Sequence, residues 1–196
     1  MDGIAPTLVF GGGGSSRMLD LRQVLRLSPA LQDSCVALGA MFRHRGPENF
    51  VNSSSDSRTA FEHYARAVTQ VKDAIAGPRD MPRLPILWAV FLLSLFELMV
   101  DDTGQNWIVH VLSGISRLLE AVGPDAIRYD SYRTFFLEVR VFEISRSLIT
   151  TSESILVRPR WRRVSDGLWS GEHASEWHPN EMLLDLMVDV SHFGFR

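Results

Sequence analysis

The sequence predicts an all-α protein of about six helices, packed as an irregular helical bundle. Apolar residues recur at helical spacing in six segments, Gly-Pro pairs end three of these segments, and no credible strand pattern lies between them. The chain has 196 residues, which is enough for a domain with a proper core. Its net charge of -3 provides no strong electrostatic attraction to nucleic acid.

Residues 1–27 are predicted to form a flexible arm ahead of a helical domain over residues 28–196. The run Gly11–Gly14 raises the question of a phosphate-binding loop, but Arg17 follows the serines where such a loop requires a Gly-Lys pair. A dinucleotide fingerprint would need a third glycine and an acidic residue about 20 positions later in a βαβ unit. Asp33 is near that spacing but lies in a helical pattern, so a flexible linker is favoured.

The first two predicted helices have recognisable starts or stops. Ser28 is a preferred N-cap residue, and Pro29 suits the first helical position. The first helix ends at Gly46-Pro47 and the second at Gly77-Pro78. The apolar stripe of the first helix is made by Leu31, Cys35, Leu38 and Phe42. The apolar face of the second is made by Phe61, Tyr64, Ala65, Val68, Val71 and Ile75.

The stretch from Pro85 to Trp107 is the most apolar part of the chain. Its apolar run, Ile86–Val100, has about 15 residues and would span roughly 22 Å as a helix, whereas a bilayer core is roughly 30 Å thick. Glu97 lies inside the run, and a carboxylate in lipid is costly. The run is therefore predicted to be a central core helix rather than a membrane span.

Asp102, Thr103 and Gly104 match the active-site triplet of aspartic proteases. Such an enzyme needs two of these loops, because its two carboxylates share a proton, and this chain has one. Asp, Thr and Gly are also turn and N-cap residues. Asp101 and Asp102 are therefore predicted to end one helix and to cap the next.

Three further helices are predicted after this turn. The fourth, over residues 104–124, ends at Gly123-Pro124 and carries Trp107, Val111, Ile115, Leu118 and Leu119. The fifth, over residues 131–150, is expected to bury Phe135, Val139, Phe142 and Leu148. A looser segment rich in Arg, Trp and Ser follows. The sixth begins with Pro179 and is expected to pack through Leu183, Leu186, Met187 and Val190.

Two polar segments contain residues that could bind a ligand. Possible metal ligands are Glu172, His173, Glu176 and His178. They lack the His-Glu-x-x-His spacing of zinc enzymes, so an exposed polar loop is favoured and no metal is predicted.

The second polar segment places Arg158, Arg160, Arg162 and Arg163 around Trp161. A basic patch with an aromatic residue can bind phosphate and stack a base. This segment is short and the chain is acidic overall, so arginines that lie over a buried tryptophan are favoured.

No enzyme is predicted, and no catalytic residue or cofactor is assigned. Cys35, the single cysteine, excludes an internal disulfide and is expected to be a small core residue of a protein in a reduced compartment. His63 and His110 have no nucleophile at motif spacing, and the chain has no Gly-x-Ser-x-Gly motif.

Taken in order, these segments resemble the all-helical regulatory domain of fungal zinc-cluster transcription factors. The family shows a Ser-Pro-Ala-Leu helix, a His-Tyr-x-x-Ala helix, a Leu-Phe-Glu helix, a Trp-x-x-His-x-x-Gly segment and a Leu-Leu-Asp-Leu helix. The matching positions are Ser28 to Leu31, His63 to Ala67, Leu95 to Glu97, Trp107, His110, and Leu183 to Leu186, while Gly114 lies one position beyond the glycine of the family pattern. The resemblance extends over roughly residues 28 to 190.

The resemblance implies a nuclear transcription regulator that works through contacts with the transcription machinery or a homologous regulator, without a membrane. It also implies control of a specialised-metabolite gene cluster, which members often regulate. An uncovered apolar face, left where the remaining helices of the family would pack, would bind another protein or, as a homo-oligomer, a second copy of the chain. Gly114 is expected to permit the close approach of a neighbour, since glycine inside a helix costs about 1 kcal/mol.

The sequence departs from the family in two ways. The DNA-reading module holds two zinc ions with six cysteines, and Cys35 is the only cysteine here, so this chain is not expected to bind DNA through a zinc cluster. Family members usually continue well beyond the equivalent of Arg196, so a truncated regulator or a small stand-alone protein is expected. The alternative hypothesis is a small-molecule-binding protein or enzyme with a pocket between helices near Trp107 and His110.

Overall fold

The computed structural model of the chain describes residues 25–26, 28–45, 53–77, 83–101, 103 and 113–194. In chain order, its elements are α2 (Pro29–Arg45), α3 (Ser53–Ala76), α4 (Arg83–Val100), α5 (Ser113–Val122), η2 (Pro124–Arg128), α6 (Asp130–Ile149), η3 (Ile155–Val157), α7 (Pro159–Gly167), η4 (Gly171–Glu176) and α8 (Pro179–Phe193). Every element in these residues is helical, which confirms the all-α prediction. The structure adds one short helix to the predicted set. This helix, α7, lies in the segment that is predicted to be looser.

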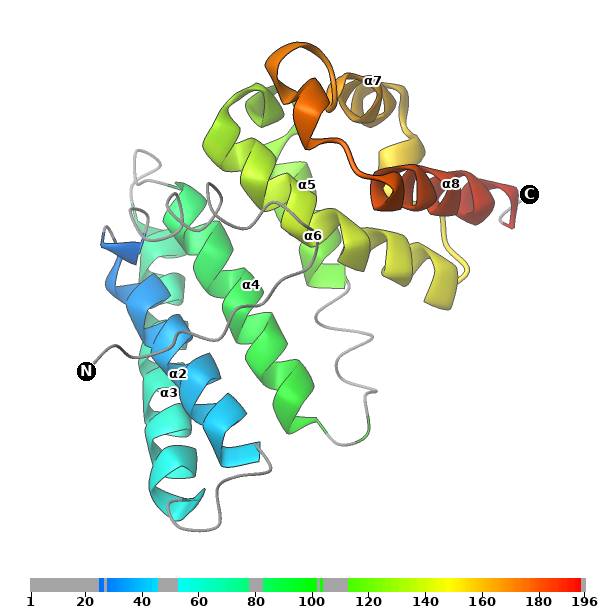
Figure 1. Cartoon of the computed structure of the whole chain (residues 1–196). Helices are drawn as coiled ribbons and strands as arrows, with labels where there is room; N and C mark the ends of the chain where they lie inside the picture. Colours follow the sequence, from blue (N-terminus) through cyan, green and yellow to red (C-terminus); the bar gives the residue numbers. More distant parts are fainter. Residues whose placement is uncertain are drawn as a thin grey trace. The chain divides into compact units, whose positions relative to one another are not determined.

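The described residues form two compact units. Unit 1 contains α2, α3 and α4, and unit 2 contains α5 to α8 with the 3-10 helices η2, η3 and η4 (Figure 1). The sequence pattern predicts one helical domain over residues 28–196 and carries no signal for this division. The predicted arm lies outside the described residues, except for positions 25 and 26.

Helix α2 begins as predicted. The Ser28 hydroxyl accepts a hydrogen bond from the Leu31 N–H at 3.4 Å, and the Ser28 carbonyl accepts one from the Gln32 N–H at 3.1 Å. The first bond satisfies an N–H group that has no carbonyl partner within the helix, and the second is the first bond of the helical ladder. One turn later, the Asp33 carboxylate accepts hydrogen bonds from the Gln70 amide at 2.9 Å and from the His63 ring at 2.6 Å, which tie α2 to α3.

One cluster in the core of unit 1 combines small residues with the ring of Phe96. Ala37, Ala40 and Ala60 are fully buried, and their small side chains let α2 and α3 approach closely. Phe96 of α4 fills the space beside them, and Tyr64 stacks on its ring at 4.6 Å between centroids. These three helices thus pack against one another mainly through alanine side chains and aromatic rings.

The family motif residues of α3 and α4 make direct contacts. The Tyr64 hydroxyl donates a hydrogen bond to the Glu97 carboxylate at 2.7 Å, so the His-Tyr-x-x-Ala and Leu-Phe-Glu motifs meet. Burial raises the pKa of Tyr64 well above its usual value, and the hydrogen bond to Glu97 and the charge of that carboxylate raise it further. These residues therefore fix the packing of two helices.

Helix α4 is buried around most of its circumference, as its sequence predicts. Its buried residues are Leu87, Trp88, Ala89, Phe91, Leu92, Leu93 and Phe96. No helix in the described part of the chain is long and apolar enough to cross a membrane. After α4, the Asp101 carboxylate accepts hydrogen bonds from the N–H and the hydroxyl of Thr103, which is the predicted turn; Asp102 lies outside the described residues.

Helix α6 is the central element of unit 2, and it contacts α5, η2 and α8. Its buried residues are Arg133, Phe135, Phe136, Leu137, Val139, Arg140, Glu143, Ile144 and Ser147. Trp161 of α7 stacks on Phe136 with the ring centroids 5.7 Å apart. The predicted Gly-Pro stop is also observed, because α5 ends at Gly123, which has φ 74, a conformation that favours glycine.

Glu143 is a fully buried carboxylate that organises the core of unit 2. It accepts hydrogen bonds from the Arg146 guanidinium, from the hydroxyls of Ser116 and Ser154, and from the Ile155 N–H, the last three residues coming from outside α6. Burial alone would raise the pKa of Glu143, but these hydrogen bonds and the charge of Arg146 hold its pKa below the usual value. The carboxylate is therefore charged and fully bonded, as a buried charge requires.

Some residues of the expected stripes are exposed. Phe42, Phe61, Ala65, Ile75 and Leu148 have open surface, whereas Ala37, Ala40 and Ala67 carry the burial in their helices. Leu31 and Val71 of the expected stripes are buried as well, so closely approaching helices bury small residues in addition to some of the large ones.

The close approach expected at Gly114 is not seen among the described residues. A Cβ atom added to this glycine would meet no atom of that part of the chain within 4 Å.

Candidate interaction surface

Helix α8 presents apolar side chains on two sides. Val188 is buried, and Leu184 and Met187 are half-buried against unit 2. A second set is between 53% and 72% exposed: Met182, Leu183, Leu186, Val190 and Phe193. These five side chains fall within an arc of about 100° on a helix of 3.6 residues per turn. We call this arc the α8 outer face.

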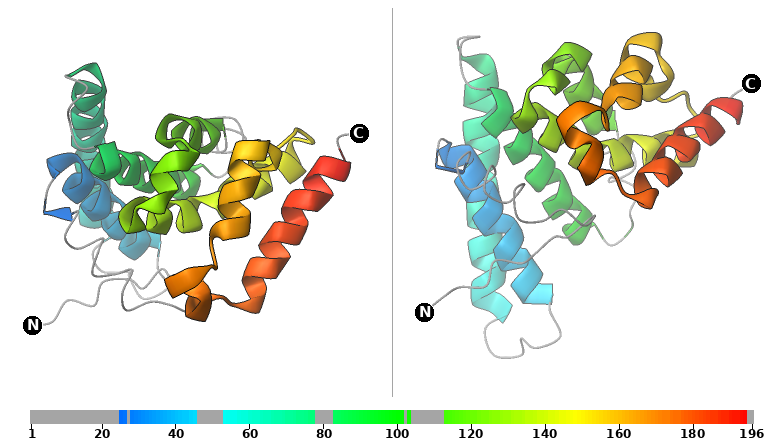
Figure 2. Two further views of the ribbon diagram at one scale, coloured as in Figure 1. Left: turned by 90° about the horizontal axis from the view of Figure 1, so that it is seen from above. Right: turned by 45° about the horizontal axis from the view of Figure 1, so that its top comes forward.

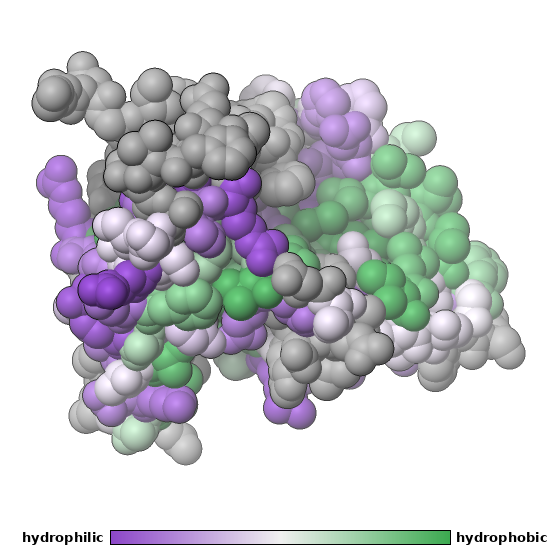
Figure 3. All heavy atoms as spheres, turned by 90° about the horizontal axis from the view of Figure 1, so that it is seen from below, coloured by the Kyte–Doolittle hydropathy of each residue, from purple (hydrophilic) through white to green (hydrophobic). Residues whose placement is uncertain are grey.

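A helix at the surface normally turns polar residues outward, and a contiguous exposed apolar patch indicates an interaction site. The α8 outer face departs from this rule along its whole length. Figure 2 shows α8 at the edge of unit 2 in both views, and Figure 3 shows apolar side chains gathered on the side where α8 and the end of α6 lie in Figure 1. The face is therefore the main candidate for a partner-binding surface.

The packing predicted for α8 is wrong for three of its four residues. Leu183, Leu186 and Val190 were expected to be buried, but they lie on the outer face, and only Met187 is partly covered. Apolar residues surround most of the helix, and one acidic row interrupts them. The pattern is therefore compatible with burial of either the side that carries Val188 or the side that carries Leu186. The exceptional width of the apolar arc is the sequence signal for a partner-binding helix.

Four contacts fix the position of α8. The His178 ring nitrogen accepts a hydrogen bond from the Asn180 N–H at 3.2 Å and caps the helix, which begins with Pro179. Glu181 forms an ion pair with the buried Arg140 of α6. Arg162 of α7 forms an ion pair with Asp189 at 2.5 Å. With the buried Val188, the two ion pairs hold the sides of α8 opposite and next to the outer face against unit 2, so the outer face points away from it.

An acidic row runs directly beside the outer face. Glu181, Asp185 and Asp189 follow one another at four-residue spacing, one position before the apolar row Met182, Leu186 and Val190. Burial raises the pKa of Asp185, and nearby charges modify it: Arg140 and Arg162 lower it, while Asp166 and Asp189 raise it. Neither Asp185 nor Asp166 has a hydrogen bond or ion pair within the described part of the chain.

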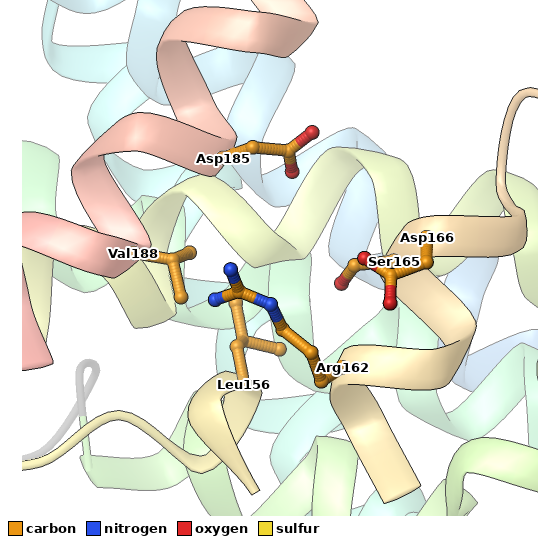
Figure 4. A pocket seen from close by; sticks show the side chains of 6 residues that line it. All are labelled: Leu156, Arg162, Ser165, Asp166, Asp185 and Val188. Atoms are coloured by element: carbon orange, nitrogen blue, oxygen red, sulfur yellow. The ribbon is translucent and has the colours of Figure 1, made fainter. Parts of the chain in front are cut away.

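A small hollow lies between η3, α7 and α8 (Figure 4). It is lined by Leu156, Arg162, Ser165, Asp166, Asp185 and Val188, and the Arg162 side chain reaches across it from α7 toward α8. Its volume of about 60 Å³ is far below the roughly 300 Å³ at which ligand pockets begin. The hollow is therefore too small for a metabolite, although the end of one side chain can enter it.

The arginines that surround Trp161 are engaged within unit 2. Trp161 is buried, as expected, and so cannot stack a base. Arg158 ion-pairs with Glu120 at 2.6 Å, Arg160 with Asp125 at 2.7 Å, and Arg162 with Asp189. Arg163 donates to the Pro159 carbonyl at 3.3 Å. Most of the positive charge of this segment thus serves to join α7 to α5, η2 and α8.

The possible metal ligands also have partners in unit 2. His173 lies 3.0 Å from Glu176 and 3.5 Å from Asp130, and Glu176 ion-pairs with Arg133 at 2.9 Å. His178 points to the start of α8 instead. Among the described residues, no three His, Cys, Asp or Glu side chains are arranged to hold a metal ion.

The remaining candidate residues of the sequence either lie outside the described residues or belong to unit 1. Trp107 and His110, which define the alternative pocket, lie outside the described residues. Cys35 is half-buried, and burial raises the pKa of its thiol to about 11, so it is a poor nucleophile. His63 is paired with Asp33, as described above.

Comparison with known proteins identifies the family. Residues 21–186 match the fungal-specific transcription factor domain, which covers all of the helices described above except the end of α8. Searches of curated proteins and of solved structures gave no match. Because the matched region makes up most of the chain, the protein belongs to the family of the fungal-specific transcription factor domain.

Proposed function

We propose that this protein regulates transcription in the nucleus, without enzymatic activity, by binding another protein through the α8 outer face. The family supports the regulatory role. The observation that carries the mechanism is the exposure of Met182, Leu183, Leu186, Val190 and Phe193 along one helix. Burial of such side chains contributes about 25 cal/mol for each Å² removed from water, so a partner gains substantially by covering the face.

A complementation experiment tests this mechanism. In a strain that lacks the gene, we expect wild-type protein to restore the regulated transcripts and the double variant Leu186→Ser/Val190→Ser to fail. Phe42→Ser is the matched control, because Phe42 is an exposed apolar residue of α2 in the other unit. The proposal is wrong if the double variant, present at wild-type levels, restores transcription fully.

We also propose that the regulated genes form a specialised-metabolite cluster, as is frequent in this family. RNA sequencing of the deletion strain should then show the strongest changes in contiguous biosynthetic genes. Changes scattered over unrelated loci would contradict this assignment. A fluorescent fusion should accumulate in the nucleus, and a fusion excluded from the nucleus would contradict the location.

A further inference from the structure

We infer that the occupant of the α8 outer face is an amphipathic helix of another protein, with an apolar stripe bordered on one edge by lysines or arginines. This inference rests on the proposed function and adds the chemistry of the partner. Four features support it: the dimensions of the face, the acidic row beside it, the hollow between η3, α7 and α8, and the unfavourable charges of a self-paired α8.

The dimensions of the face suit a helix. Met182 and Phe193 are eleven positions apart, which is about 16 Å along the helix axis, or three turns. The five exposed side chains project from one arc and leave spaces at the i, i+4 and i, i+3 spacings of a helix surface. A partner helix of three or four turns can pack its own ridges between them, which is a common mode of peptide recognition.

The acidic row determines the charge of the partner. Glu181 and Asp189 have the guanidinium partners Arg140 and Arg162, but Asp185 between them and Asp166 on α7 have none among the described residues. Four carboxylates are thus matched by two guanidinium groups. A helix lying on the outer face passes directly beside this excess of negative charge, and cations on its near edge would be attracted.

The hollow gives one of these cations a specific position. Asp166 and Asp185 line it from α7 and α8, with Leu156 and Val188 as its apolar walls (Figure 4). A lysine or arginine can place its charged end near the two carboxylates and its alkyl stem against the apolar walls. Its guanidinium or ammonium would then join Arg162 in neutralising the cluster.

A second copy of this chain is a poorer occupant. In an antiparallel pair of α8 helices, the two-fold axis places the acidic row of one copy beside the acidic row of the other, and like charges in contact are costly. In a parallel pair, the acidic row of each copy lies beside the other edge of the outer face in its partner copy. That edge is formed by Leu183 and Met187 and carries no cation. Neither arrangement supplies positive charge to Asp185.

A displayed peptide library tests the inference. Each peptide is a helix with leucines at i, i+4, i+7 and i+11, and its two edges are varied among Lys, Arg, Glu and Gln. Against the full chain, we expect enrichment of Lys and Arg on one edge. Binding of the selected peptides should fall roughly three- to tenfold with Asp166→Asn/Asp185→Asn. It should fall by at least roughly tenfold with Leu186→Ser/Val190→Ser. The control Phe42→Ser should bind as the wild type does.

Three results would overturn the inference. The first is enrichment of peptides without an edge preference or with acidic edges. The second is binding of the selected peptides by the Leu186→Ser/Val190→Ser variant as strong as by the wild type. The third is self-association of the chain that this variant abolishes. The last result would assign the face to a second copy. Because the complementation experiment measures regulation and the library measures partner chemistry, failure of the inference can be distinguished from failure of the proposed function.

Discussion

Helices α4 and α8 have similar sequences in one respect, because both are apolar around most of their circumference. Helix α4 is covered on most sides, whereas α8 is covered on one side and exposes five large apolar residues on the other. The pattern that predicts a central helix thus has two outcomes. A helix of this type either finds its neighbours within the described chain or offers an apolar face to another protein.

The two helices also differ in how they are held. Helix α4 packs through rings and aliphatic groups around Phe96, while α8 depends on ion pairs to Arg140 and Arg162 together with the buried Val188. We expect substitutions in the first environment to cost far more stability than substitutions on the α8 outer face. Four predictions test this difference, in order of decreasing effect.

Phe96→Ala should have the largest effect. It removes a fully enclosed ring and leaves a cavity, so the free energy of unfolding should fall by about 3–5 kcal/mol in urea denaturation. Phe42→Ala is the matched control, because the same ring is 56% exposed there, and it should change stability by less than about 0.5 kcal/mol. Equal losses for the two variants would refute the burial assigned to them.

Glu143→Gln should destabilise unit 2 by about 3 kcal/mol, since the amide brings N–H donors toward groups that already donate. The wild-type contribution also depends on pH. The pKa of Glu143 is lower in the folded state than its ordinary value of 4.5, so its stabilisation is present above that value and is lost as the pH falls below it.

Urea denaturation of both proteins between pH 3 and pH 7, a range of about 4 units, can measure this effect. Glu120→Gln provides the control, because its ion pair with Arg158 is largely exposed and should contribute less than about 0.5 kcal/mol. An unchanged acid dependence in Glu143→Gln would show that another carboxylate is responsible.

Tyr64→Phe should lower the stability of unit 1 by about 1.5 kcal/mol, because the bond to the Glu97 carboxylate is lost. The pKa of Tyr64 is raised in the folded state, so its contribution is complete below the ordinary value of 10.0 and declines as the pH rises above it. Denaturation above that pH should therefore show a steeper decline for wild type than for Tyr64→Phe. Identical slopes would disprove the coupling.

Leu186→Ser/Val190→Ser should have the smallest effect on stability, within about 0.5 kcal/mol of the wild type in urea, because both side chains are more than half exposed. A loss comparable to that of Phe96→Ala would mean that the outer face is covered within the protein. The proposed partner-binding role of α8 would then be withdrawn.

The sequence predicts the helical class and several helix boundaries because these depend on local chemistry. Ser28 caps α2 through its own hydroxyl, and Gly123 ends α5 in a backbone conformation that favours glycine. Helix α7 was missed, since it has nine residues and its arginines obscure the single buried contact of Trp161. Its first-position proline, Pro159, is the signal that could have indicated it.

The candidate surface was less predictable because burial is not a local property. Leu183, Leu186 and Val190 have the spacing of a packed stripe, and the spacing itself does not say whether the neighbour belongs to the same chain. Glu143 was not singled out either, although a carboxylate between apolar residues and three positions before Arg146 is the pattern of a buried pair. Only the three-dimensional contacts show its partners.

The arrangement around Glu143 also has a consequence for the order in which unit 2 folds. Its donors lie 27 positions earlier at Ser116 and 11 and 12 positions later at Ser154 and Ile155. Each contact requires closure of a loop, and the longer loop costs more chain entropy. Before these groups donate their hydrogen bonds, we expect water to hydrate the Glu143 carboxylate and the side of α6 around it. We therefore expect this part of the core to form late in folding, once α5 and η3 have reached α6.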